Sequence, residues 1–392
     1  MHAVTSIAST DYVVDTFFDD WRDEGHRILV NTVRDRLDAL APAWARSIDD
    51  AALLDPLVVN ALTVEAPQPL LEQLLWGLVA PHLRPALEVT VGDDGRVLVA
   101  GLGFFANALP GATATLVQRD GRPTLHEHPA AVLTTFPTAG ALPVFPHRHP
   151  WLRPFIELQD VVYEDTAIDR PVVENLAPLT AALDWIARVA PRQHHEILRD
   201  TRLVILTQHE RLLSAVGLCI HGAVIINVRG PSTPLFFVEE LAHQCGHVTF
   251  GKVIVDWPKF LRVPYDTPMN VLGAAEDDTR SFGDALHGNY TLVRMLQLFD
   301  RILAHDLLAP GVYQELRGRA CMAARRLEQG LPDLEDRRLY REHGWFVHQR
   351  LEHAFADVMS RLAPHVHGLD LSQQPYAFDL EQFDRRNPMT TT

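Results

Sequence analysis

The stretch from Pro234 to Phe250, PLFFVEELAHQCGHVTF, constrains this chain most, because it places His243 and His247 four residues apart in a helical pattern. Its apolar residues recur at helical spacing, Thr233 is a suitable N-cap, and a proline follows where the first helical turn tolerates one. Residues four apart share one face of a helix, so both imidazoles can bind one metal ion. The stretch therefore predicts a metal-binding helix.

The order of elements around this helix supports a metal site. An apolar run at residues 222–228 (GAVIINV) predicts a strand, a short Gly-Pro turn follows, and the histidine helix comes next. Many metal-hydrolase domains share that order. Because a chain with 20 histidines contains such pairs by chance, the alternative is that both rings only pack or face solvent.

Gln244 departs from the usual pattern of such helices. A divalent-metal helix normally reads His-Glu-x-x-His, and the glutamate is the general base for a metal-bound water. Glutamine cannot accept that proton, so a hydrolytic mechanism lacks its base at this position.

Composition excludes several classes of protein. The chain has 392 residues, 47% of them hydrophobic, which is typical of a globular protein with one large domain or two. The net charge of −15 and the lack of a Lys/Arg-rich run argue against a nucleic-acid partner. No apolar segment reaches membrane-spanning length, and the N-terminal residues lack a secretory pattern. Three cysteines without paired spacing indicate a reducing compartment, so we expect a cytoplasmic protein of undetermined oligomeric state.

The expected fold class is α+β, with a border near residue 155. Residues 1–155 form the N-terminal region: helices from residue 11 to about 87, then two hairpins with turns at Asp94–Gly95 and Asp120–Gly121 in a small antiparallel sheet. The proline-rich residues 130–158 act as a connector.

Residues 156–392 form the second expected region, a largely helical metal-binding catalytic domain that contains the His-x-x-x-His helix. Two apolar runs, TRLVILTQ and GLCIHGAVIINVRG, predict buried strands ahead of that helix. Further helices follow it, and the tail after Pro364 is expected to be weakly ordered.

Other histidines offer weaker candidates. Two His-x-His pairs, His126 with His128 and His147 with His149, would each point both rings to one face of a strand. Prolines flank both pairs, so we expect solvent-facing loop histidines instead of ligands. The cluster at residues 194–196 (HHE) is expected to be a polar cap at a helix end.

A metal site on the histidine helix needs a further protein ligand. Thermolysin-like peptidases use a glutamate from a following helix, and non-haem iron enzymes often use two histidines and one carboxylate. Glu276 is the nearest candidate in chain order, with Asp277 and Asp278 beside it. Any of the three can serve either chemistry.

Two stretches, EELAHQCGHVTF and TRSFGDALHGNYTLVRML, resemble the HEXXH-motif domain proteins. Some members of that family are 2-oxoglutarate-dependent iron hydroxylases that act on ribosomally made peptides. The resemblance implies that His243, His247 and His287 bind Fe(II), with 2-oxoglutarate as cosubstrate. It also implies a peptide substrate, such as a natural-product precursor, or an amino acid.

The Gln244 substitution separates the possible activities. It removes the base from a peptidase, whereas an oxygenase needs no protein base and can use glutamine as a hydrogen-bonding group beside the metal. We therefore expect an Fe(II)/2-oxoglutarate-dependent hydroxylase. The alternatives are a zinc metallopeptidase-like hydrolase and a non-catalytic metal-binding scaffold.

The cosubstrate's distal carboxylate would suit an arginine, because a guanidinium group can donate two parallel hydrogen bonds to it. Arg280 and Arg294 are the nearest in sequence, and Arg294 lies two turns beyond His287 on the same predicted helix. Tyr290 is adjacent to the site by spacing, and it fits the hydrophobic core equally well.

Overall fold

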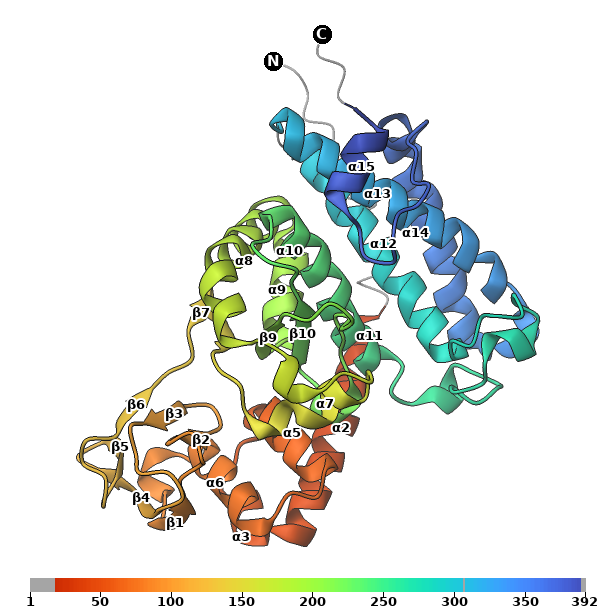
Figure 1. Cartoon of the computed structure of the whole chain (residues 1–392). Helices are drawn as coiled ribbons and strands as arrows, with labels where there is room; N and C mark the ends of the chain where they lie inside the picture. Colours follow the sequence, from red (N-terminus) through yellow and green to blue (C-terminus); the bar gives the residue numbers. More distant parts are fainter. Residues whose placement is uncertain (1–17, 306, 389–392) are drawn as a thin grey trace, which may run out of the picture. The chain divides into compact units, whose positions relative to one another are not determined.

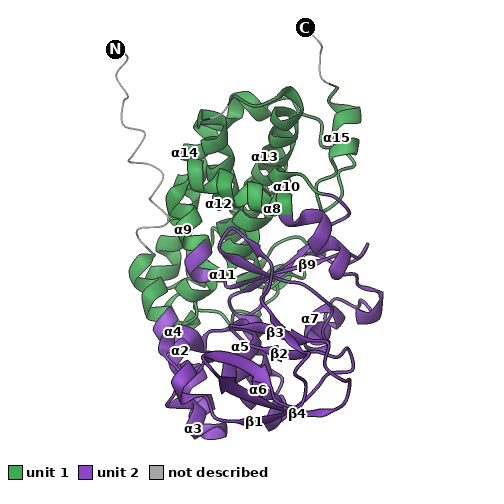
Figure 2. Ribbon diagram, turned by 90° about the vertical axis from the view of Figure 1, so that its left-hand side faces the viewer, with its two compact units in different colours: residues 1–25, 177–197, 232–392 green, residues 26–176, 198–231 purple. Residues whose placement is uncertain are grey.

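The computed structural model describes residues 18–305 and 307–388, and its helices and small sheets give the expected α+β class (Figure 1). The chain divides into two compact units. Unit 1 comprises the residues up to Gly25, Ala177–Ile197 and those from Ser232 onward. Unit 2 comprises His26–Leu176 and Leu198–Pro231 (Figure 2). Among the described helices, none combines the length and apolar character needed to span a bilayer.

These units differ from the single border expected near residue 155. Strand β8 (Leu142–Phe145) pairs in parallel with β9 (Leu203–Thr207), and β9 pairs in parallel with β10 (Ala223–Asn227). Backbone hydrogen bonds therefore join the chain on both sides of that border. The units are discontinuous because this sheet draws residues 198–231 into unit 2.

Unit 2 begins with helices, as the periodicity predicts. The expected helical region starts at residue 11, and its residues before 18 lie outside the described part of the chain. The described helices of this region are α2 (Asp19–Leu40), which belongs to unit 2 from His26, α3 (Pro42–Ala45), α4 (Asp50–Leu53), α5 (Pro56–Thr63), α6 (Gln68–Leu78) and the 3-10 turn η1 (Pro81–Leu83).

One of the two predicted hairpins forms. Strands β4 (Thr113–Arg119) and β5 (Arg122–Leu125) pair across Asp120–Gly121, and both turn residues have the positive φ that a tight two-residue turn requires. The hairpin expected at Asp94–Gly95 is wrong. A turn exists there, but β1 (Leu87–Thr90) pairs with β4, while β2 (Val97–Val99) pairs with β3 (Gly103–Ala106).

Two of the parallel strands of unit 2, β9 and β10, are the runs expected to be buried. Every residue of β9 and of β10 is buried. They form a mixed sheet of order β10-β9-β8-β7, in which the edge strand β7 (Thr138–Ala139) is antiparallel to β8. The remaining strand, β6 (Val132–Thr134), pairs with β3.

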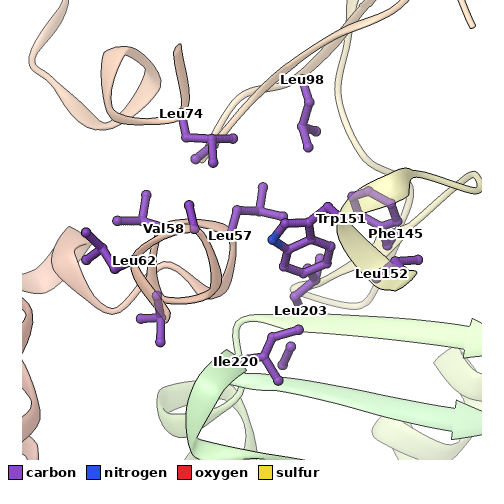
Figure 3. Close-up of a cluster of buried hydrophobic side chains, with 14 of the residues drawn as sticks. Leu57, Val58, Leu62, Leu74, Leu98, Phe145, Trp151, Leu152, Leu203 and Ile220 are labelled. Atoms are coloured by element: carbon purple, nitrogen blue, oxygen red, sulfur yellow. The ribbon is translucent and has the colours of Figure 1, made fainter. Parts of the chain in front are cut away.

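Helix α5 lies inside the main core of unit 2. Its residues from Pro56 to Leu62 are all buried, so the helix is enclosed on every side. Figure 3 shows Leu57, Val58 and Leu62 projecting from it in different directions, with Leu74 of α6 on one side and Ile220, beside the parallel strands, on the other. This packing fixes the helices of unit 2 to its sheet.

Unit 1 is built from long helices that pack on one another. They include α8 (Asp169–Val189), in this unit from Ala177, α9 (Pro191–Asp200), in this unit up to Ile197, α10 (Pro234–Glu240), α11 (Gly246–Val253), α12 (Phe282–His305), α13 (Pro310–Gly330) and α14 (Glu342–Val366). Short connections make α12 and α13 antiparallel neighbours, and both also contact α14.

The tail after Pro364 is better packed than expected. Pro364 lies inside α14, and the chain continues into α15 (Leu380–Arg386). Phe383 of α15 is fully buried and packs closely on Gly318 of α13. The expectation of a weakly ordered tail is therefore wrong for residues 365–388, and the last residues, 389–392, lie outside the described part.

Candidate metal centre

The histidine helix starts as the sequence predicts. The Thr233 hydroxyl accepts a hydrogen bond from the Phe236 amide at 3.1 Å, and Pro234 occupies the first turn of α10. The same hydroxyl donates to Glu315 of α13 at 2.8 Å, and Arg319 bridges Glu315 to Glu239. These contacts hold the start of α10 against α13, which fixes the direction of the histidine segment.

A π-helical segment, η5 (Leu241–Cys245), separates α10 from α11 and contains His243. His247 follows in the first turn of α11. A π turn holds more residues than an α-helical turn, so it changes the relative directions of two side chains that are four residues apart. The imidazole centroids of His243 and His247 lie 5.0 Å apart. Such single-turn π segments are frequent at functional sites, because they redirect a side chain without ending the helix.

His287, on the first turns of α12, meets His247 directly. Their Nδ1 atoms are 3.3 Å apart, and the rings stack with centroids 5.4 Å apart and planes inclined by 16°. The structure therefore brings together the three histidines singled out by the resemblance, with His247 in the middle.

A glycine allows α12 to come this close. Gly246 follows η5 and faces Thr291 of α12, where an added Cβ would lie 3.1 Å from the threonine Cγ2. A larger side chain would therefore push on the helix that carries His287.

Aromatic rings surround His287. Phe250 of α11 lies edge-on to it at 4.9 Å and stacks on Tyr290 at 4.4 Å, with the latter two planes inclined by 12°. Tyr290 is almost fully buried, so its ring belongs to the core beneath the histidines. Tyr265, from the loop before α12, lies edge-on to His287 on another side at 6.2 Å.

The imidazoles are held in their neutral form. Burial lowers the pKa of His243 and of His287 to about 4. It also lowers the pKa of His247 well below 6.5, and the neighbouring imidazoles add to the effect. Each ring keeps partial solvent exposure. Neutral imidazole is the form that binds metal ions, so these residues present suitable donors at neutral pH.

The spacing of the two nearest nitrogens fits a shared ion. Two nitrogens bound to one ion at 2.0–2.1 Å with a tetrahedral angle would be about 3.3 Å apart, as Nδ1 of His247 and His287 are. A hydrogen bond between the rings, with one Nδ1 protonated, gives the same distance. Within residues 18–305 and 307–388, no three His, Cys, Asp or Glu side chains are already arranged to hold a metal ion. His243 therefore lies beside His247 and His287, but the three side chains do not converge on one point as a set of metal donors.

Gln244 is buried in η5, on the turn between the two helical histidines. Its side-chain amide donates a hydrogen bond to Glu240 at 3.3 Å, one helical turn earlier. The motif position that normally holds a base thus carries a neutral amide tied to its own helix.

Each of the two candidate arginines is hydrogen-bonded to a carboxylate of this chain. Arg280 is exposed and donates two hydrogen bonds to Asp278, at 2.9 and 2.7 Å. Arg294 is buried and donates to Glu196 of α9 at 2.7 Å. Glu196 also pairs with Arg192, so this buried glutamate is part of an ion-pair network and the expected polar cap is wrong.

The candidate carboxylate ligands lie in the loop before α12. Glu276 and Asp277 are exposed, and Asp278 pairs with Arg280. Asp284 was not expected as a candidate, although it precedes His287 by three residues and so shares its helix face. It accepts a hydrogen bond from the Tyr265 hydroxyl at 2.8 Å, and its charge acts on His287.

The His-x-His pairs of unit 2 divide into exposed and buried residues. His126 is exposed, as expected for a loop. His147 is not, because its ring packs edge-on against Phe104 at 4.5 Å and beside Phe145 at 5.3 Å. The expectation of solvent-facing histidines is wrong for His147. Neither of its ring nitrogens has a hydrogen-bond partner among the residues that the structure describes.

Comparison with known proteins adds no relative. No protein-family model matches the chain, and no curated protein matches it. The likeness to the HEXXH-motif proteins therefore rests on the two short stretches quoted above.

Proposed function

We propose that this protein is a non-haem Fe(II)/2-oxoglutarate-dependent oxygenase that hydroxylates a side chain of a peptide, such as a natural-product precursor, or of an amino acid. His243, His247 and His287 are the proposed iron ligands. Bound Fe(II) and 2-oxoglutarate would supply the oxidising chemistry, and the protein would hold the donors, exclude water and orient the substrate.

The contact between His247 and His287 carries the proposal. These rings come from different helices, 40 residues apart in sequence, and their Nδ1 atoms approach to 3.3 Å in neutral form. The nearby His243 ring has to turn towards this pair to give a third donor. A helical side chain can make that turn by changing rotamer, without a backbone movement.

The surroundings of the pair suit an oxygenase better than a hydrolase. The amide of Gln244 cannot take a proton from water, and it already donates to Glu240. Phe250 and Tyr265 enclose His287 with aromatic rings, which limits the approach of water. The side chains beside the histidines therefore provide shelter and orientation, and the motif position carries no base.

Metal binding tests this site directly. We expect the full-length protein, reconstituted with Fe(II) without oxygen, to bind about one ion per chain, and His287→Ala to weaken binding about 100-fold. His305→Ala is the matched control, because His305 is exposed at the far end of the same helix. Equal affinities for these two variants would refute the ligand assignment.

Turnover separates the oxygenase from the zinc hydrolase. We expect the iron-loaded protein to convert 2-oxoglutarate to succinate when it is given candidate peptides, and His247→Ala to abolish this reaction. The hydrolase alternative predicts that the zinc-loaded Gln244→Glu variant gains peptidase activity while the parent protein has none. Failure of the reconstituted protein to bind either metal would favour a scaffold without catalytic function.

A further inference from the structure

Unit 2 contains a cavity of about 350 Å³ that is separate from the histidine site. Helix α2 lines it with Leu29, Val33 and Arg36, which recur at the spacing of one helix face. Leu62 of α5 and Cys219 of the 3-10 turn η4 (Leu218–Ile220) also line the cavity. All of these residues belong to the same compact unit.

Most of the wall is apolar. Thr32 and Thr63 line the cavity, and their hydroxyls donate to backbone carbonyls of their own helices, at 2.8 and 2.9 Å. Burial raises the pKa of the Cys219 thiol, which is therefore neutral at physiological pH. His221, a buried residue, and Arg36 are the other polar side chains of the wall, and the rest of the lining is aliphatic.

Arg36 gives the cavity its cation. Its side chain is 47% exposed and donates to Glu65 at 3.1 Å, and that glutamate is 81% exposed. An ion pair between such exposed groups is worth at most about 1 kcal/mol, so the guanidinium can exchange Glu65 for a better-placed carboxylate. Arginine suits this role because its planar group donates two parallel hydrogen bonds to a carboxylate.

We propose that this cavity binds a small aliphatic carboxylate, with the hydrocarbon chain inside and the carboxylate on Arg36. The volume lies at the small end of the range for ligand pockets, about 300–1,000 Å³, which favours one medium-length chain over a long lipid. The site contains no residue of the histidine centre, so this proposal does not depend on the proposed oxygenase activity.

Cys219 provides a built-in reporter for this site. It lines the cavity and is partly exposed, whereas Cys245 and Cys321 are buried. We expect decanoate, kept below its micelle concentration, to slow alkylation of Cys219 by iodoacetamide at least fivefold and saturably in the full-length protein. Peptide mass spectrometry measures the rate at each cysteine. No protection of Cys219 by decanoate would overturn the proposal.

Three variants and a neutral ligand test the two halves of the site. Arg36→Gln should weaken protection by decanoate about tenfold, and Glu65→Gln, which removes the competing carboxylate, should not weaken it. Val33→Trp, at a partly exposed position of α2, should fill the cavity and abolish protection. Decanol should protect about tenfold more weakly than decanoate. Equal protection by decanol, or by decanoate in correctly folded Arg36→Gln protein, would overturn the assignment of the carboxylate to Arg36.

Discussion

Two groups of histidines in this molecule share a pKa shift and differ in geometry. In unit 1, burial lowers the pKa of His243 and His287 to about 4, and in unit 2 it does the same for His147 and His149. The unit 1 rings approach one another through nitrogen atoms, to 3.3 Å for His247 and His287. The unit 2 rings are 6.4 Å apart between centroids, and both lie against Phe145.

This difference shows that a lowered histidine pKa does not by itself identify a site. Any imidazole surrounded by apolar groups loses hydration of its charged form, whether or not its nitrogens face another donor. Only the unit 1 rings also have the nitrogen spacing of a shared ion. The unit 2 rings instead contribute to an aromatic core, with Arg96 and Asp94 as their charged neighbours.

The sharpest test of this contrast is metal affinity after removal of one imidazole from each group. His247→Ala should weaken Fe(II) binding about 100-fold or more, because it removes the central ring of the proposed ligand set. His147→Ala should leave metal affinity unchanged, although it also removes a buried ring. Equilibrium dialysis with metal analysis measures both, and a greater loss in His147→Ala would reverse the assignment of the two groups.

A second test changes only the support of His287. An added Cβ at Gly283 would lie 1.7 Å from the Tyr265 ring, so Gly283→Ala must displace the tyrosine that flanks His287. We expect a loss of about 2 kcal/mol in the free energy of unfolding, as for other overpacked sites, and weaker metal binding. Chemical denaturation with and without Fe(II) measures both effects.

Gly288→Ala is the matched control for that change. Gly288 lies on the same helix, and nothing lies within 4 Å of its added Cβ. Alanine is a better helix former than glycine, so this variant should be neutral or slightly more stable. If both variants behaved alike, the packing of Tyr265 would have no part in supporting the histidines.

Local signals in the sequence predicted the start of the histidine helix and several elements of unit 2. Thr233 and Pro234 mark the start of α10 through capping, and the Asp120–Gly121 turn forms because both residues accept positive φ. The buried strands β9 and β10 follow from apolar runs alone. Each of these features depends on residues close together in the chain, which is why the sequence reveals them.

The features that the sequence did not predict depend on distant contacts. Strand β1 pairs with β4, beyond the turn at Asp94–Gly95 and the strands β2 and β3, and β8 joins β9 from 60 residues away, so neither partner is visible locally. His147 is flanked by prolines in sequence, yet Phe104 buries it. The π segment at Leu241–Cys245 likewise has no spacing signal, because the same residues would fit an uninterrupted α-helix.

The smallest expected effect concerns the acid sensitivity of unit 2. The pKa of His147 in the folded protein is about 4, lowered chiefly by burial, with further lowering by Arg96 and His149 and partial compensation by Asp94. Between pH 6.5 and 4 the unfolded chain therefore binds a proton that the folded chain does not. Stability falls as the pH drops through this window, and above it this residue adds no pH dependence.

Replacing His147 with phenylalanine should remove this contribution. The new ring suits the surroundings of Phe104 and Phe145, and it has no nitrogen to leave without a partner. We expect the loss of unfolding free energy between pH 7 and about 5.5 to shrink by roughly 1 kcal/mol relative to the parent protein. Exposed His126, changed to phenylalanine, should leave that loss unaltered. If His147→Phe lost as much unfolding free energy as the parent protein, the His147 ring would be hydrated in solution. The two histidine groups would then differ in exposure as well as in geometry.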